Sequence, residues 1–343
     1  MIHYLRYCCA MLFALFSFLL ATPLSAQAQT REAYVSQSED QTTLTFYYDA
    51  LRSTRTGTTW EIMEYSSENK IYPAWAGTWD WADKTTTRVV FDASFRDFRP
   101  TTTATWFFRC NALKQIEGLE YLNTSEVKDM SSMFYDCQAL TSIDLKHFNT
   151  KNVTDMSWMF CDCVALTSLD LKNFDTKNVT KMGSMFAGCA ALTSINLKNV
   201  NTKKVTDMSW MFYDCAALTS IDLKSFNTKN VADMAVMFRG CSALNSLDLQ
   251  HFNTKNVTDM SLMFFDCAAL TTIYCNTTWQ CRASEKMFAG CTKLKGAVAY
   301  NKNKVDAKMA NPKTGYFTAK PTMVERNRRR AAHLPTARKR GAW

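Results

Sequence analysis

A five-residue motif, Met-Phe-x-x-Cys, recurs at a nearly constant interval and constrains the fold more than any other feature of this sequence. It begins at Met133, Met159, Met185, Met211, Met237, Met263 and Met287, and a degenerate copy begins at Trp106. The cysteines are separated by 27 residues, then by 26 five times, then by 24. A constant period with an irregular copy at each end predicts a stack of repeats closed by two caps.

One unit predicts how each repeat folds. Val153, Met156, Phe160 and Cys163 lie at i, i+3, i+7 and i+10, the spacing of a helical stripe. The following Leu-x-x-Leu-x-Leu pattern at residues 166–171 ends in the alternation of a strand. We therefore expect a short helix, a short strand and two turns per unit. The fold class is α/β: a solenoid with a parallel sheet, short helices and a cap at both ends.

The repeat also resembles a known family. The segment Phe148–Leu171 is similar to the repeats of BspA-like leucine-rich-repeat surface proteins of anaerobic, host-associated bacteria. The resemblance extends from about residue 32 to about residue 319 and includes Thr42–Asp49 and the closing segment Asn311–Phe317. It implies a right-handed leucine-rich-repeat solenoid at the cell surface that binds host matrix proteins, epithelial proteins or other bacteria. It implies no reaction, and no recognisable sorting domain follows Phe317.

The N-terminus has the pattern of an export signal. Arg6 precedes an apolar run of about 14 residues, and Ala26-Gln27-Ala28 provides a small-x-small cleavage site. The run is shorter than the roughly 20 residues that span a bilayer, which favours a cleaved signal over an anchor. We expect a signal peptide at 1–28, a mature chain without a transmembrane span, and a secreted or cell-surface location.

Four further segments follow the signal. We expect an N-terminal cap region at 29–86, the leucine-rich-repeat array at 87–267, a C-terminal cap at 268–319 and a basic, disordered tail at 320–343. From Lys320 onward, eight Lys or Arg against one acid carry +7 of the formal net charge of +9. The rest of the chain is nearly neutral, which argues against a nucleic-acid partner.

Thirteen cysteines admit disulfides, a metal site or a buried column of thiols. The motif cysteines lie on the apolar stripe, and a line of thiols cannot surround one metal tetrahedrally, so we expect buried free thiols and no metal. Cys275 and Cys281 lie outside the column in a capping loop. For these two, a disulfide and free thiols stay equally open.

The polar strand positions form two columns, which are a secondary candidate for a binding surface on the concave side. The acidic column contains Asp144, Asp170, Asp222 and Asp248, and the basic column contains Lys146, Lys172, Lys198 and Lys224. Asn196 interrupts the acids and the lysines neutralise them. We therefore favour a ladder of salt bridges over a calcium site, which requires six to eight oxygens around one point.

The leading candidate surface comes from the helical wheel. Residue 158 and its equivalents point about 180° from the core stripe, and the position three residues later lies nearby. Together these positions predict an exposed convex patch of Trp158, Trp210, Tyr213, Val236, Leu262 and Phe265. Partial burial of these side chains against their neighbours is an equally open interpretation.

Two functions of different classes follow. The leading hypothesis is a non-catalytic, adhesin-like module that binds host or bacterial surface proteins. The alternative is a carbohydrate-binding protein that uses Trp75, Trp79 and Trp81 of the N-terminal cap, although large aromatics in a cap more often form its core. The four histidines are scattered, and no HExxH, phosphate loop or G-x-S-x-G pattern occurs. We expect no catalytic residues and no cofactor.

Overall fold

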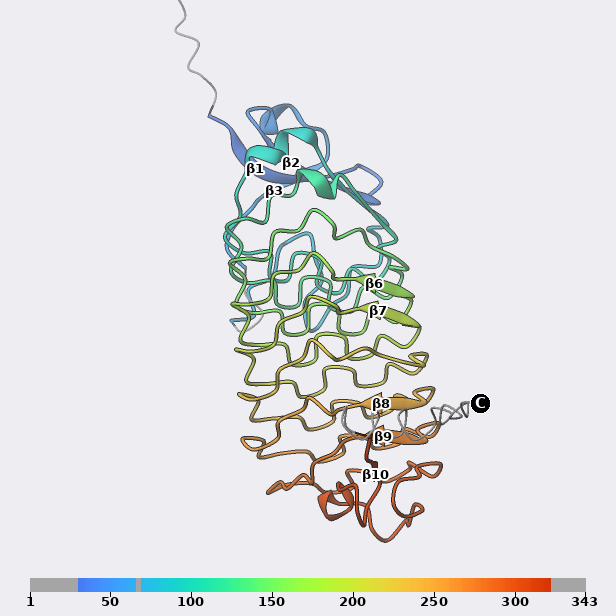
Figure 1. Cartoon of the computed structure of the whole chain (residues 1–343). Coiled ribbons are helices and arrows are strands. Elements are labelled where there is room, and N and C mark those ends of the chain that lie inside the picture. The colour runs from blue at the N-terminus through green and yellow to red at the C-terminus, as the bar shows by residue number, and fades with distance from the viewer. Residues whose placement is uncertain (1–29, 66–68, 322–343) are drawn as a thin grey trace, which may run out of the picture.

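A computed structural model describes residues 30–65 and 69–321. The expected signal peptide at 1–28 and nearly all of the expected basic tail lie outside these residues. Successive repeats form flat coils that stack on one another along a single direction, with the N-terminal segment at one end of the stack and the C-terminal segment at the other (Figure 1). The sheets are mixed, and every helical segment in the described residues is a 3-10 turn.

The N-terminal end is a five-stranded sheet in the order β3-β1-β2-β4-β5. The strands are β1 (Glu32–Gln37), β2 (Thr43–Asp49), β3 (Thr58–Glu61), β4 (Arg88–Phe91) and β5 (Gln115–Glu117). β1 pairs antiparallel with β2 and β3, whereas β2, β4 and β5 are mutually parallel neighbours. β2 of the β1–β2 hairpin pairs with β4. The hairpin thus covers the outer edge of β4, which would otherwise be unpaired. The 3-10 segments η1 (Arg52–Thr54), η2 (Ala93–Asp97) and η3 (Leu119–Tyr121) connect these elements.

The predicted helix at residues 153–163 is wrong. This segment and its equivalents are chains of tight turns that bond to the neighbouring coil. Cys161 donates its N–H to the Trp158 carbonyl three residues back, whereas Phe160 donates to the Met185 carbonyl of the next coil at 3.0 Å. Alternate N–H groups therefore close turns and link coils, and the i→i−4 pattern of an α-helix does not form.

Backbone dihedrals explain why no helix forms. Trp158 has a φ of 62° and Asp162 a φ of 59°, both in the left-handed region that a right-handed helix cannot contain. Positive φ recurs at the position of Trp158 in Thr105, Ser132, Ser184, Trp210, Val236, Leu262 and Lys286. Because the conformation repeats in every coil, it belongs to the architecture rather than to one functional residue.

The Leu-x-x-Leu-x-Leu segments lie on one side of the stack, where short strands run parallel (Figure 1). β6 (Ser168–Asp170) pairs with β7 (Ser194–Asn196), and β8 (Ser246–Asp248) pairs with β9 (Thr272–Tyr274). β10 (Phe317–Thr318) adds to β9 and covers its edge at the C-terminal end. The expected parallel strands are therefore present, in two short sheets.

The core consists of columns of identical side chains. The motif phenylalanines from Phe107 to Phe288 stack with ring centroids 5.4–6.1 Å apart. A column of buried threonines links the coils: Thr202 Oγ1 donates to the Asn227 carbonyl at 2.9 Å and accepts from the Asn227 N–H at 2.7 Å. Thr124, Thr150, Thr176 and Thr228 donate to a carbonyl of the next coil in the same way, so these buried hydroxyls are satisfied between coils.

The C-terminal end of the stack is covered by residues that lie outside the repeats. Tyr316 and Phe317 are buried, and the Tyr316 hydroxyl bonds to backbone groups of Asn301 and Lys304. The 3-10 segment η4 (Ala307–Met309) lies beside them, and Asn311 Oδ1 accepts the Thr314 N–H at 2.7 Å. These contacts give the last coil an apolar cover.

Candidate functional site

The predicted surface patch does not lie on a helix, and its members differ in exposure. Trp158 and Trp210 are 43% and 40% exposed, whereas Val236 is buried at 4%. Tyr213, Leu262 and Phe265 are half-buried. Val236 therefore departs from the expected exposure. Ser132 and Ser184 are buried at the equivalent positions, so side chains larger than valine are needed to reach the surface from this turn.

Trp210, Tyr213 and Phe265 of the predicted patch form one connected group with Arg239, which the predicted patch did not include. The Trp210 and Tyr213 rings meet edge to face with centroids 4.9 Å apart. The Arg239 guanidinium lies 5.6 Å from the Tyr213 ring centroid and 5.1 Å from that of Phe265. We call Trp210, Tyr213, Arg239 and Phe265 the Trp210 ridge. It crosses three successive coils.

Trp158 belongs to a second group. Tyr135 lies between Trp158 and Trp79, with ring centroids 6.0 and 5.3 Å away, and it stacks on Phe108 at 4.7 Å. Burial raises the pKa of the Tyr135 hydroxyl, so this side chain presents an uncharged aromatic surface to the two indoles. Ser184 and Ala187, both small and buried, occupy the corresponding positions between Trp158 and the Trp210 ridge.

A cleft of about 290 Å³ opens beside Trp79 and Trp158. Its lining also contains Ser131, Ser132, Asp155, Ser157 and Lys181. Lys181 Nζ lies 3.1 Å from Asp155 Oδ2, and the Asp155 side chain is only 15% exposed. We call this feature the Trp79 cleft. Sequence reasoning could not find it, because nothing in the repeat places the irregular cap beside Trp158.

The three cap tryptophans of the carbohydrate-binding alternative, Trp75, Trp79 and Trp81, divide between core and surface. Trp75 is buried, and its Nε1 donates to the Trp106 carbonyl at 2.9 Å. Trp79 and Trp81 are 46% and 57% exposed. Core packing therefore accounts for Trp75, while the other two remain available to a ligand.

The polar columns form ion pairs within single coils. Lys146 Nζ lies 2.7 Å from Asp144 Oδ2, and Lys172 Nζ lies 3.0 Å from Asp170 Oδ2. The corresponding distance from Lys224 to Asp222 is 3.6 Å. In the interrupted coil, Asn196 Nδ2 donates to Asp170 Oδ1 and Asn196 Oδ1 accepts the Lys198 N–H. These exposed pairs are well solvated, so each contributes little to stability.

Asp248 has a different partner from the other acids of its column. Lys320 Nζ lies 2.6 Å from Asp248 Oδ2 and 4.2 Å from the Tyr274 ring centroid. Partial desolvation opposes ionisation of Asp248, but the hydrogen bonds from Lys320 and Gln250 and the charge of Lys320 together outweigh it, so the pKa of Asp248 is lowered. The first residue of the expected tail is thus fixed against the strand face.

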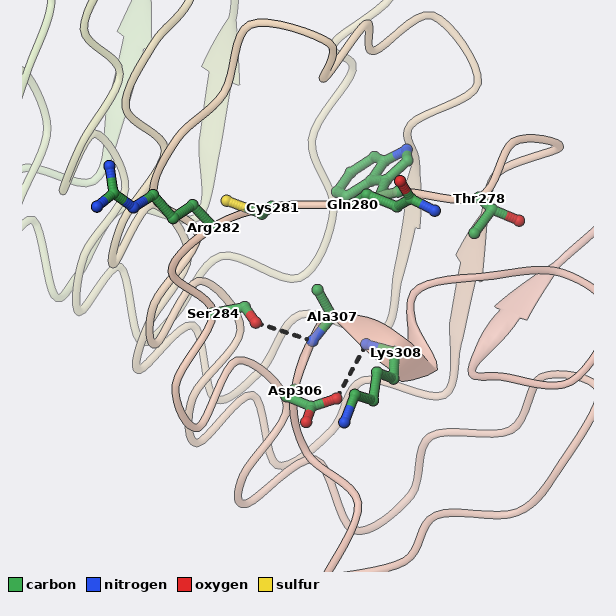
Figure 2. Close-up of a pocket in the computed structure, with 9 residues that line it drawn as sticks. Thr278, Gln280, Cys281, Arg282, Ser284, Asp306, Ala307 and Lys308 are labelled. Carbon is green, nitrogen blue, oxygen red and sulfur yellow. Dashed lines mark hydrogen bonds between the residues drawn. The ribbon is translucent and has the colours of Figure 1, made fainter.

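A cavity of about 470 Å³ at the C-terminal end contains Cys281 but no disulfide (Figure 2). Cys275 and Cys281 are both free thiols in the described structure. Cys281 Sγ donates to the Ala283 carbonyl at 3.1 Å. Across the cavity, the Asp306 carboxylate accepts the Lys308 N–H and Ser284 Oγ accepts the Ala307 N–H.

The motif cysteines are buried, free thiols. Each Sγ from Cys137 to Cys291 donates to the carbonyl of the motif phenylalanine of the preceding coil, at 2.9–3.2 Å. Burial raises the pKa of thiols such as Cys163 and Cys189, so they are poor nucleophiles at neutral pH. Cys161, which lies outside the motif column, is buried as well.

Two other kinds of feature are absent from the described part of the chain. Within residues 30–65 and 69–321, no group of three or more His, Cys, Asp or Glu side chains is arranged to hold a metal ion. The same residues include no helix with the length and hydrophobicity needed to cross a membrane.

Comparison with family models identifies the repeat. A model described as "Mycoplasma protein of unknown function, DUF285" matches residues 101–196 and 187–301, more than half of the chain. The chain belongs to the DUF285 family. DUF285 is a family of BspA-like repeats, so the resemblance found in the sequence is confirmed.

Two solved structures are similar to this DUF285 chain at low identity. One is a T. pallidum leucine rich repeat protein, with 18% identity over 64% of this chain and 90% of that one and a TM-score of 0.35. The other is a leucine rich cell surface protein from Faecalibacterium prausnitzii A2-165, with 16% identity over 86% of this chain and 95% of that one and a TM-score of 0.34. No curated protein matches the sequence significantly.

Proposed function

We propose that this protein is a non-catalytic, adhesin-like binding module, exported to the cell surface or beyond it, that binds host or bacterial surface proteins. Its coils form a capped, right-handed solenoid whose repeated core supports a variable surface. The observation that carries the proposal is the Trp210 ridge, a connected group of three aromatic rings and one arginine on coils that are otherwise nearly identical inside.

The composition of the ridge suits a protein partner. Trp, Tyr and Arg are the residues most enriched among those that dominate binding energy at protein interfaces. Arg239 contacts the Tyr213 and Phe265 rings in the absence of a partner, so less side-chain freedom is lost when a partner docks. Leu262, which the sequence also placed in this patch, is half-buried and supports the ridge only at its margin.

A double substitution that copies a neighbouring coil tests the proposal. The variant Trp210→Ser with Tyr213→Ala gives this coil the residues that Ser184 and Ala187 provide one coil earlier. The backbone conformation at position 210 is thereby kept, since Ser184 has the same left-handed φ. Binding to immobilised host matrix proteins and to bacterial cell-surface extracts should weaken by at least about 2 kcal/mol, with little change in the melting temperature.

The matched control is Asp222→Ser with Lys224→Ser on the strand face, which should leave binding unchanged. If the strand-face variant loses binding and the ridge variant does not, the interface lies on the Asp and Lys columns instead. A large loss of stability in the ridge variant, with binding per folded molecule intact, would show that the ridge is packing.

A further inference from the structure

The Trp79 cleft has a construction that the Trp210 ridge lacks: two exposed indoles border a hollow with a polar lining. Trp79 comes from the N-terminal cap and Trp158 from a coil of the repeat, and Tyr135 contacts both rings. The hollow exists because Ser132 occupies the position that holds a tryptophan in the next coil. The walls are therefore aromatic and the floor is small and hydroxylated.

The polar groups of the cleft are fixed by the backbone. Asp155 Oδ1 accepts the Ser157 N–H at 2.8 Å, and Asp155 Oδ2 pairs with Lys181 at 3.1 Å. The Asp155 carboxylate is mostly shielded, whereas about half of the Lys181 side chain remains exposed. A carboxylate acceptor, an ammonium donor and serine hydroxyls thus line one side of a cavity whose other walls are apolar.

The wall formed by Trp79 is also fixed before any ligand arrives. Arg109 Nη1 donates to the carbonyls of Thr78 and Trp79, at 3.0 and 2.5 Å, and Arg109 Nε pairs with Asp136 Oδ2 at 3.1 Å. The Gly77 N–H donates to the Phe108 carbonyl at 2.7 Å. The turn that carries Trp79 is clamped to the first two coils, so little ordering entropy is lost when a ligand binds.

We propose that the Trp79 cleft binds a pyranose ring of a cell-surface glycan. A pyranose has a C–H face that packs on an indole and a rim of hydroxyls that bond to carboxylates, ammonium groups and serines, and this combination matches the lining. At about 290 Å³, the cavity is at the lower end of the range for small-ligand sites, which fits one ring of a longer chain. The site shares no residue with the Trp210 ridge, so the inference goes beyond the protein-binding function and does not depend on it.

This assignment changes the residues expected to contact a glycan. Of the three cap tryptophans, Trp79 alone lines the cleft, and its partner is Trp158 of the array rather than Trp75, which is buried. Sequence alone grouped Trp158 with Trp210, because the two occupy equivalent repeat positions.

The experiment uses the exported protein and a panel of methyl pyranosides, namely the glucoside, galactoside, mannoside and N-acetylglucosaminide, followed by an array of immobilised oligosaccharides. Titration is followed by intrinsic tryptophan fluorescence, which reports directly on the two walls. We expect saturable binding of at least one pyranoside and at least about tenfold weaker binding after Trp79→Ala, Trp158→Ser or Asp155→Asn. Trp158→Ser keeps the residue that Ser132 and Ser184 use in the same backbone conformation, so it should fold even if Trp79→Ala does not.

The control is the variant Trp210→Ser with Tyr213→Ala, which should bind the pyranoside like the unmodified protein. Absence of binding to every pyranoside and oligosaccharide would overturn the proposal, and so would equal loss of binding in the control. If the cleft variants instead lose binding to a protein partner while no glycan binds, the cleft is an extension of a protein interface. Failure of the ridge variant to affect protein binding would leave the glycan result untouched, so the two functions are tested separately.

Discussion

The carboxylate of Asp214 occupies the space that a side chain at Gly240 would need in the next coil. A Cβ atom added to Gly240 would overlap Asp214 Oδ1, and Gly240 has a φ of +75°. The same relationship joins Asp162 to Gly188 and Asp266 to Gly290. Aspartate and glycine therefore alternate along most of this column, because each carboxylate requires an empty position beside it.

Gly240→Ala should destabilise the protein by about 2 kcal/mol or more, since the left-handed conformation alone costs about 1–2 kcal/mol and the clash adds to it. The measurement is urea or thermal unfolding of the two proteins. Adding Asp214→Gly to the Gly240→Ala variant should restore part of the loss, because it removes the clash and glycine tolerates the φ of 50° at position 214, while the backbone strain at position 240 remains. Strictly additive effects of the two substitutions would show that the residues do not interact.

Two neighbouring aspartates, Asp136 and Asp162, interrupt the alternation in this column and lead to a pH-dependent prediction. Asp162 follows Asp136 with no glycine between them, and burial together with the nearby Asp136 charge raises the pKa of the Asp162 carboxyl. A folded pKa above the unfolded value of about 3.9 means that ionisation disfavours the folded state. The stability that the protonated group provides is present at low pH and is lost as the pH rises through the folded pKa.

Asp162→Asn should therefore raise the melting temperature at about pH 7 and leave it nearly unchanged at about pH 3, where the aspartate is protonated in both states. Asparagine also tolerates the φ of 59° at this position. The matched control is Asp214→Asn, whose neighbours in the column are Gly188 and Gly240 instead of aspartates. Equal stabilisation at both pH values would exclude relief of a buried charge as the cause.

The sequence predicts the stack but not the local backbone. A period of 26 with buried Val153, Met156, Phe160 and Cys163 fits a helix and a chain of turns equally well, because both bring side chains at these spacings to one side. The distinguishing signal is the column of Gly188, Gly240 and Gly290, which a helix interior disfavours. The buried threonine column was missed for a similar reason, since threonine in a polar turn gives no sign of burial until the coils are stacked.

The candidate site could be predicted only in part. Variation at positions 158 and 161 and their equivalents correctly indicates surface for Trp158 and Trp210, and it fails for Val236 and Cys161, which are buried. The contact of Trp79 with Tyr135 joins an irregular cap to the repeat, and periodicity carries no information about such a contact. Arg239 was not singled out either, because its role depends on rings in the coils on both sides of it.

Removal of one whole repeat should be tolerated. Deletion of residues 178–203 joins Lys177 to Lys204, which keeps the repeat in register and allows Phe160 to stack on Phe212 in place of Phe186. Because contacts in a stack are nearest-neighbour, the variant should remain folded and unfold cooperatively with a modestly lower melting temperature. Deletion of residues 178–190 moves the following coil out of register and should unfold the array locally, which proteolysis will detect. Equal tolerance of both deletions would refute the stacked architecture.

The thiol column predicts a large difference in reactivity between the native and unfolded protein. The eight column cysteines are Cys110, Cys137, Cys163, Cys189, Cys215, Cys241, Cys267 and Cys291. All are buried, so the reagent cannot reach them in the native state. Burial also raises the pKa of most of these thiols, so little of the thiolate that alkylation requires is present. Cys281, which is half-buried beside an open cavity, should be the native thiol in the described residues that reacts first.

Iodoacetamide labelling of the native protein at about pH 8 should modify Cys281 before any of the column thiols react. Labelling in denaturant should then modify at least the eight column thiols. Peptide mapping assigns each modified site. The result also bears on the proposed export, since an oxidising environment favours disulfides wherever two thiols can meet. Here each Sγ from Cys137 to Cys291 donates to the backbone carbonyl of a phenylalanine, as Cys189 does to Phe160 at 3.1 Å. Mapping that finds bridges between adjacent coils would show that this orientation is lost after export, and that the core of the stack differs from the one described.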